Sequence, residues 1–240
     1  MKHYLLKVMM VVLILYGISD ITHAQTRSSY PVDDAVTFEA FPDSVMERLG
    51  DKNTNLTAYK TEVEGQDGFK AYQSFVKFDI SDLNSEVVSA NFSIRSSRVD
   101  KDADLRLRIR PVGNDWSGDD LTWATRPDNN GDWAANLQWD GNSPRVSFDN
   151  VDNRLVEAIN EAVRRGDDYF SLRIASFQQD TTTTLWIGGK GDGSWGPILE
   201  YRTAPTSSYY PVDDAVTFEA YPDSVMERLG DKNTNLTAYK

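Results

Sequence analysis

The sequence predicts an all-β protein, an antiparallel jelly-roll-type β-sandwich that carries one amphipathic helix. Two observations lead to this fold. Apolar and polar residues alternate with a period of two in many short segments, which is typical of strands with one buried face and one face in water. A single segment instead spaces its apolar residues by four, which is the period of a helix.

The clearest predicted strand covers residues 71–80, where Val76, Phe78 and Ile80 share one phase and Lys77 and Asp79 share the other. The same alternation predicts strands at residues 88–94, 105–109, 170–174 and 185–187, with weaker matches at 36–38, 56–58 and 198–201. Many short strands of this kind favour a sandwich over a single open sheet.

The predicted helix covers residues 151–163, with its apolar stripe at Val151, Leu155, Ile159 and Val163. Gly166 follows a basic pair and marks the end of the helix, and Asn150 or Asp152 is the expected N-cap. We expect this helix to cover an open edge or end of the sandwich.

Residues 112–144 are rich in Asn, Asp, Gly and Trp, and only residues 121–123 resemble a short strand. This stretch predicts long loops at one end of the sandwich. Loops of that length often have a function or bind an ion.

The chain contains an internal repeat, because residues 211–240 match residues 31–60 except that Tyr221 replaces Phe41. The repeat predicts one complete β-sandwich module at residues 25–202, a polar linker at 203–209 and the truncated start of a second module at 210–240. We therefore expect the sequence to be a fragment of a longer tandem-module protein, and we expect the second start to be loosely ordered.

Residues 1–24 resemble a secretory signal, with Lys2 and Lys7 before an apolar run that is too short to span a membrane comfortably. Removal of the two lysines and Asp20 would take the net charge from −12 to −13. The remaining chain would contain neither His nor Cys, which excludes disulfides, imidazole or thiolate metal ligands and Ser-His or Cys-His nucleophiles. So acidic a chain is also a poor partner for nucleic acid.

Five segments resemble the DNRLRE-type domains, which overlap carbohydrate-binding module family 96. Residues 74–80 and 88–94 are similar to the family's opening strands, and residues 115–127 (Asp-Trp-Ser-Gly-Asp-Asp-Leu-Thr-Trp-Ala-Thr-Arg-Pro) to its Trp-Ser, Thr-Trp and Arg-Pro stretch. Residues 151–174 resemble its helix and following strand, and residues 196–201 its closing strand. The resemblance implies a secreted bacterial β-sandwich attached to polysaccharide-degrading enzymes or cell-surface proteins, with alginate among its ligands.

Alternation places Arg106, Arg108 and Arg110 on the outward phase of one strand, and Arg95 on the outward phase of the strand before it. If these strands pair as a hairpin, Arg95 joins the row. Three or four guanidinium groups in a row form a platform for carboxylate or sulfate. The alternative is a solvated face whose charge the abundant Asp and Glu neutralise.

Outward-facing aromatic rings would supply the stacking half of sugar recognition. Trp186 is out of phase with its apolar neighbours, Tyr59 also lies on an outward phase, and Trp195 lies in a Gly-rich turn. We expect Trp116 and Trp123 to have a packing role instead.

The loop residues Asp128, Asn130 and Asp132 offer oxygen ligands suited to Ca²⁺, although their spacing is not that of an EF-hand. Simple solvated turns are the alternative. Structural calcium is thus a candidate cofactor, and the sequence identifies no certain one.

Together these features predict a non-catalytic polysaccharide-binding module of a secreted or cell-surface multimodular protein. The expected partner is an anionic glycan such as alginate, bound by Arg95, Arg106, Arg108, Arg110, Trp186 and Tyr59. The alternatives are a structural or adhesive surface repeat and the N-terminal accessory region of a polysaccharide lyase or glycoside hydrolase. In the last case the catalytic domain would lie beyond Lys240.

Overall fold

The structure is a computed structural model of the 240-residue chain. It describes residues 26–47, 55–99, 105–139, 145–177, 185–190, 195–204, 216–218 and 221–226. The predicted signal at residues 1–24 and most of the second repeat copy lie outside the described residues. The chain divides into two compact units, one of which is Ala24–Ala204.

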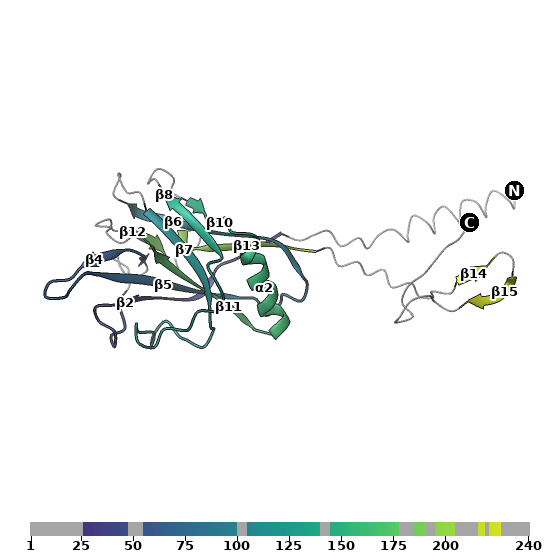
Figure 1. The fold of residues 1–240 in the computed structure, drawn as a ribbon, viewed down its shortest axis with the longest axis horizontal. Helices are drawn as coiled ribbons and strands as arrows, with labels where there is room; N and C mark the ends of the chain where they lie inside the picture. The colour runs from purple at the N-terminus through teal and green to yellow at the C-terminus, as the bar shows by residue number, and fades with distance from the viewer. Residues whose placement is uncertain are drawn as a thin grey trace. The chain divides into compact units, whose positions relative to one another are not determined.

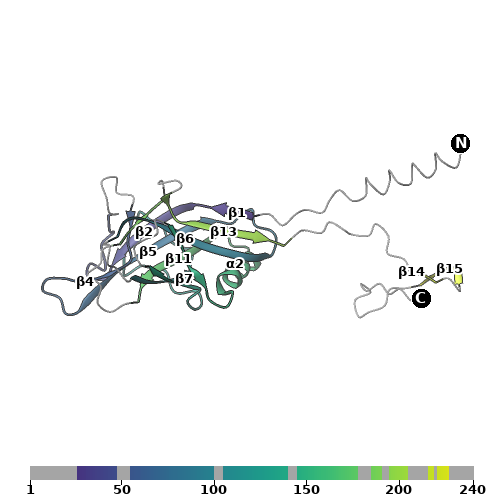
Figure 2. The ribbon, with the colours of Figure 1, turned by 90° about the horizontal axis from the view of Figure 1, so that it is seen from above.

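Two antiparallel sheets make up this unit, as Figures 1 and 2 show. The six-stranded sheet has the order β1-β13-β6-β12-β3, and β9 pairs with β6. Its strands are β1 (Thr26–Ser29), β3 (Asn55–Leu56), β6 (Val87–Val99), β9 (Arg145–Ser147), β12 (Leu185–Gly188) and β13 (Ile198–Thr203).

The seven-stranded sheet has the order β10-β8-β7-β11-β5-β2, and β4 pairs with β5. Its strands are β2 (Pro31–Phe38), β4 (Lys60–Glu62), β5 (Phe69–Asp79), β7 (Leu105–Val112), β8 (Ala135–Trp139), β10 (Asp149–Asn150) and β11 (Tyr169–Ser176). The predicted all-β sandwich is confirmed.

The main core lies between the two sheets and follows directly from the alternation of side chains. Leu107 and Ile109 of β7 are fully buried in the same apolar cluster as Phe92 and Ile94 of β6. Burial of each such side chain stabilises the fold by about 1.5–3 kcal/mol. The residues between them on each strand must therefore point away from the core, toward the outer face of their sheet.

The helix α2 (Arg154–Arg165) covers one end of the sandwich (Figure 1). It buries Leu155, Ile159 and Ala162 in the main core, which confirms the predicted helix and its role. Gly166 ends it in the left-handed region with φ 75°, where glycine has no Cβ to clash. The N-cap position is Asn153, not Asn150 or Asp152, but the side chain of Asn150 accepts the N–H of Leu155 at 3.2 Å.

The interval 112–144 differs from the prediction in one respect. Residues 121–123 form no strand, whereas β8 forms farther along and pairs with β7 through Leu107 and Leu137. The sequence of β8, Ala-Asn-Leu-Gln-Trp, does alternate, but it lies within a stretch whose composition is typical of loops.

The short strands β1, β4, β9 and β10 were not predicted either, since two to four residues carry almost no periodic signal.

A second, smaller apolar cluster holds the loop after β7 against the outer face of the seven-stranded sheet. It consists of Ala35, Phe75, Val112, Trp116 and Leu121. The Nε1–H of Trp116 also donates to the hydroxyl of Ser171 in β11 at 3.2 Å. The packing role predicted for Trp116 is confirmed, and this loop forms a wall beside the strands.

The second unit comprises Met1–His23 and Pro205–Lys240. Its described residues form a two-stranded hairpin of β14 (Val216–Phe218) and β15 (Tyr221–Met226). Across the residues that the structure describes, no helix is long and apolar enough to traverse a lipid bilayer.

Candidate functional site

Strand β7 presents the predicted row of arginines on the outer face of the seven-stranded sheet. Arg106 is exposed, whereas Arg108 and Arg110 are half-buried. The neighbouring strand β11 places Arg173 directly opposite Arg110 in the register. We call Arg108, Arg110 and Arg173 the arginine cluster, and Arg173 is the member that the sequence reasoning missed.

Aromatic rings lie against the arginine cluster. The ring of Trp133, from the loop before β8, is 4.3 Å from the guanidinium carbon of Arg110, 5.4 Å from that of Arg173 and 5.5 Å from that of Arg108. Phe177, just beyond β11, is 4.1 Å from the guanidinium carbon of Arg108. These contacts attract the cations to the ring faces and hold the long side chains in place.

No carboxylate compensates the arginine cluster in the part of the chain that the structure describes. The ion pairs among the described residues involve other cations, and none of the three cluster arginines takes part in one. The Nε atoms of all three are buried and have no hydrogen-bond acceptor. Buried polar atoms without an acceptor are costly, so the cluster has hydrogen-bonding capacity that the described residues leave unused.

The pKa of Arg173 reflects this environment. Burial is the largest cause, and together with the positive charges of Arg110 and Arg126 it lowers that pKa to about 10. With a pKa of about 10, the guanidinium of Arg173 is still charged at neutral pH. Arg110 and Arg173 therefore place like charges opposite each other in the β7–β11 pairing.

Uncharged polar groups extend the site across the sheet. Arg108 pairs with Asn136 of β8 on one side and with Ala175 of β11 on the other. Ala175 pairs in turn with Gln73 of β5, so the four residues form one row across the sheet. The Oδ1 of Asn136 and the Oε1 of Gln73 are buried without a hydrogen-bond partner. This row has the unsatisfied hydrogen-bonding capacity expected beside a polar ligand.

The wall of the site is fastened to the sheet by Asp33 of β2. Its carboxylate accepts the N–H of Gly118 at 2.9 Å and pairs with Lys190 at 3.0 Å. Burial alone would raise the pKa of Asp33, but these two partners outweigh it and the pKa is lowered. Beyond this anchor, Arg126 packs its guanidinium 4.2 Å from the ring of Trp123 and donates to the carbonyl of that residue.

Arg95 does not join the arginine cluster, which corrects the predicted row. Although β6 and β7 follow each other in the sequence, they do not form a hairpin, because β6 belongs to the six-stranded sheet. The guanidinium of Arg95 lies 3.3 Å from the ring centre of Trp195. Trp186, on β12 of that same sheet, is half-buried opposite Arg98 of β6.

Tyr59 lies between β3 and β4, and its ring stacks on Tyr72 at 4.8 Å. Burial, which is the largest cause, and the neighbouring Tyr72 together raise its pKa to about 12. Tyr72 in turn stacks on Phe38 at 3.8 Å. Tyr59 is thus one member of a half-buried aromatic stack, a setting different from the exposed platform that the sequence predicted.

The predicted calcium ligands Asp128, Asn130 and Asp132 are all exposed. The carboxylate of Asp132 lies 3.7 Å from Arg154 of α2, so a cation already neighbours it. The described residues contain no group of three or more acidic, histidine or cysteine side chains that could hold a metal. Calcium binding at this loop stays a prediction.

A groove of about 680 Å³ separates this loop from α2. Its lining mixes charges of both signs, with Arg164 and Arg165 beside Glu161. Such self-compensated charge offers less to an ionic ligand than the arginine cluster does.

Comparison with protein families decides what kind of module this is. The model of carbohydrate-binding module family 96 matches residues 34–187, which include the arginine cluster and all the strands of the two sheets except β1, β13 and the start of β2. The chain belongs to carbohydrate-binding module family 96. No curated protein matches it.

As a member of family 96, the chain has a carbohydrate as its partner, and modules of this kind are generally non-catalytic. Such modules are typically extracellular. The match confirms the resemblance found in the sequence. Within the module, the arginine cluster and Trp133 form the strongest candidate for the carbohydrate contact, because they combine unpaired cations with an aromatic ring.

Proposed function

We propose that the arginine cluster binds an acidic glycan, with alginate as the first candidate, and that the chain acts in a secreted multimodular protein. The observation that carries this proposal is the absence of any described carboxylate partner for Arg108, Arg110 and Arg173. The chain has a net charge of −12, so acidic side chains are abundant. On an ordinary solvated face of so acidic a chain, arginines would have carboxylate neighbours, and these three have none among the described residues.

A uronate residue fits the chemistry of this face. Guanidinium groups bind carboxylates with two parallel hydrogen bonds, and such charge-assisted bonds are about twice as strong as neutral ones. The ring of Trp133 lies beside the same cations, where the C–H groups of a pyranose can stack on an aromatic face. A neutral polysaccharide would leave the three charges uncompensated, so the cluster favours an acidic one.

The sequence supports the wider context. Residues 1–24 have the pattern of a secretory signal, and the repeat at residues 211–240 indicates a tandem arrangement of modules. Linked modules that each bind a polymer weakly gain avidity, because the second binding event becomes intramolecular. A protein of this design would hold on to an extracellular polysaccharide and bring attached domains close to it.

Calorimetric titration of the full chain with short alginate oligosaccharides tests the proposal. We expect Arg108→Gln/Arg173→Gln to lose one binding event or weaken it at least about tenfold, since each hydrogen bond to a charged group contributes about 1.5–3 kcal/mol. The matched control is Arg164→Gln, which removes the same charge from α2, where Glu161 compensates it at 2.6 Å. That control should bind like the parent chain.

Identical titrations for the parent and the double variant would overturn the assignment of the site. If the parent bound neither alginate nor any other acidic glycan, a structural or adhesive repeat would become the better explanation. Cello-oligosaccharides serve as the uncharged comparison, and equal binding of these would overturn the acidic specificity alone.

A further inference from the structure

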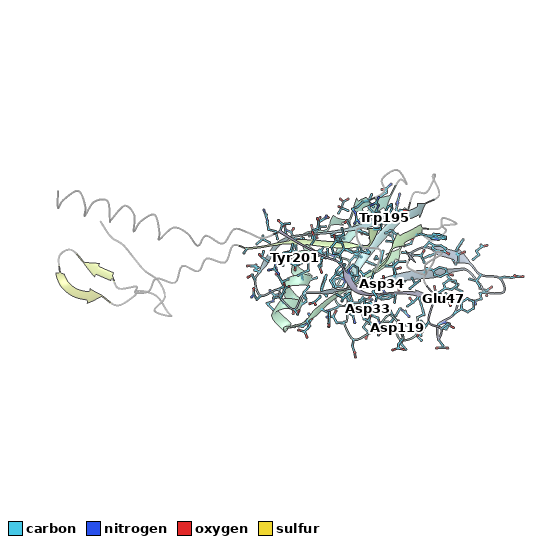
Figure 3. All side chains as sticks on the ribbon, turned by 180° about the vertical axis from the view of Figure 1, so that it is seen from behind. Asp33, Asp34, Glu47, Asp119, Trp195 and Tyr201 are labelled. Atoms are coloured by element: carbon cyan, nitrogen blue, oxygen red, sulfur yellow. The ribbon has the colours of Figure 1, made fainter. Side chains whose placement is uncertain are left out.

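The six-stranded sheet carries its own exposed aromatic residue, Trp195, just before β13. Its side chain is 48 % exposed even though a guanidinium lies against the ring. Figure 3 shows Trp195 and Asp119, which belongs to the wall beside the arginine cluster, at opposite sides of the sandwich. Trp195 is thus well separated from the site described above.

Arg95 is the cation on this ring, at 3.3 Å from the ring centre. Like the cluster arginines, it has a buried Nε without an acceptor and no carboxylate partner among the described residues. It follows Ile94, a core residue, so alternation directs its side chain outward.

A second arginine reinforces the charge. In the pairing of β6 with β9, Arg145 lies directly opposite Arg95. Burial lowers the pKa of Arg145, and the charge of Arg95 acts in the same direction, whereas Glu200 and Tyr30 act against it. Two like charges in register repel each other, and an anion placed between them would relieve that repulsion.

The backbone around Trp195 is held in place by close contacts. Arg145 donates to the carbonyl of Gly196 at 3.1 Å and to the hydroxyl of Ser93 at 3.1 Å. A Cβ built on Gly188 would lie only 2.3 Å from the carbonyl oxygen of Trp195, so β12 can approach the turn only because residue 188 is glycine. A ring carried by a fixed backbone has only its side-chain torsions to order when a ligand stacks on it.

From this geometry we infer a second binding site for a carboxylated sugar, formed by Arg95, Trp195 and Arg145. The pyranose ring would stack on Trp195, and its carboxylate would contact the two guanidinium groups. Because Ile94 and Ile109 face one core from opposite sheets, this site and the arginine cluster lie on the two outer faces of the sandwich. One module would therefore engage two glycan segments at once and could cross-link chains of an acidic polysaccharide.

The second site shares no residue with the arginine cluster, so each site can be tested by itself. Calorimetric titration of the full chain with tetramannuronate should give two sites per chain. We expect Arg95→Gln/Trp195→Ala to leave one site, Arg108→Gln/Arg173→Gln to leave the other, and the combined variant to bind none. The matched control is Arg202→Gln, which removes an exposed arginine from β13 of the same sheet and should keep both sites.

An Arg95→Gln/Trp195→Ala chain that keeps the stoichiometry and affinities of the parent would overturn the second site. Loss of one site in this variant but no change in Arg108→Gln/Arg173→Gln would overturn the proposed function and leave the second site standing. A parent chain that binds no tetramannuronate would overturn both.

Two further measurements separate binding from folding. Trp195→Phe keeps an aromatic face and should retain the second site with reduced affinity, at a thermal midpoint equal to that of the parent. Long alginate mixed with the parent chain should become turbid through cross-linking, whereas either double variant should leave the solution clear. Turbidity that is unchanged in both variants would contradict two-faced binding.

Discussion

Two groups of arginines in this module differ in one physical respect. On α2, Arg164 lies 2.6 Å from Glu161 and Arg165 lies 2.6 Å from Asp167. On the seven-stranded sheet, Arg108 and Arg173 face aromatic rings and have no carboxylate partner among the described residues. The two groups contain similar numbers of arginines, but only those on α2 are paired with carboxylates. The lack of carboxylate partners is therefore a better sign of a candidate anion site than the number of arginines.

The largest expected effect comes from giving the arginine cluster the carboxylate that α2 already has. Asn136 lies opposite Arg108 in the β7–β8 pairing, so Asn136→Asp places an anion there with almost no change in shape. We expect an about 100-fold loss of glycan affinity at the cluster, because the new carboxylate competes directly with uronate. Titration in a Trp195→Ala background measures this site by itself.

Gln66→Glu is the control for the change in net charge, since Gln66 lies in an exposed turn before β5. It should bind as tightly as the parent. If Asn136→Asp and Gln66→Glu weakened binding equally, the loss would come from overall charge, and the compensation argument would be wrong.

Salt should produce the next largest effect. Raising the NaCl concentration from about 50 mM to about 500 mM shortens the Debye length from about 14 Å to about 4 Å. We expect roughly tenfold weaker glycan binding at the arginine cluster over this range. Affinities that stay constant across a salt series would indicate recognition by stacking alone and would contradict the ionic assignment.

Removing one cluster charge should stabilise the fold while it weakens binding. Arg173→Met keeps the length and packing of the side chain but removes an uncompensated cation, so the free energy of unfolding should rise by about 1 kcal/mol. On α2, Arg165→Met breaks a surface ion pair and should lower the free energy of unfolding by at most about 1 kcal/mol. Urea unfolding of both variants checks the opposite signs, and a destabilised Arg173→Met chain would show that this cation is compensated after all.

The smallest expected effect is a pH dependence at the alkaline end. The pKa of Arg173 is about 10 in the folded chain and has its ordinary, higher value in the unfolded chain. Between those two pKa values the unfolded chain binds more protons than the folded chain, so the free energy of unfolding rises with pH. Below about pH 10 both states are protonated at Arg173, so the destabilisation that this residue causes stays constant. The stability difference between Arg173→Met and the parent should therefore shrink from about pH 9 to about pH 11. Tyr59 is common to both chains and cancels in that difference.

The strand phases could be predicted from the sequence. Arg106, Arg108 and Arg110 lie on the outer face because Leu107 and Ile109 enter the core, and this follows from a period of two within one strand. Arg173 also lies on the outward phase of a predicted strand, Phe-Ser-Leu-Arg-Ile. What could not be predicted is that β11 pairs with β7 in the register that sets Arg173 against Arg110.

The error over Arg95 has the same origin. Strands that follow each other in sequence often pair, but β6 and β7 enter different sheets, so Arg95 and Arg108 lie on different faces of the sandwich. Trp133 was missed for a related reason. It precedes β8 in a stretch with the composition of a loop, and only the pairing of β8 with β7 brings its ring to the arginine cluster.

The two copies of the repeat pair with different strands although their sequences are nearly identical. Residues 36–38 belong to β2, which pairs with β5, whereas the same residue types at 216–218 form β14, which pairs with β15. Residues 41–46 form a turn and irregular backbone, whereas residues 221–226 form β15. The two segments differ only at Phe41 and Tyr221, so the available partner strands, and not the local residues, account for the difference.

By itself, the sequence determined the class of fold, the helix α2 and the outward direction of the β7 arginines. These properties depend on composition or on spacing within one element. Only the tertiary structure decided that Arg173 and Trp133 join the arginine cluster and that Arg95 forms a separate group with Trp195 and Arg145. The physical reason is that alternation is a local property of a strand, whereas strand neighbours and register are fixed by burial of the whole core.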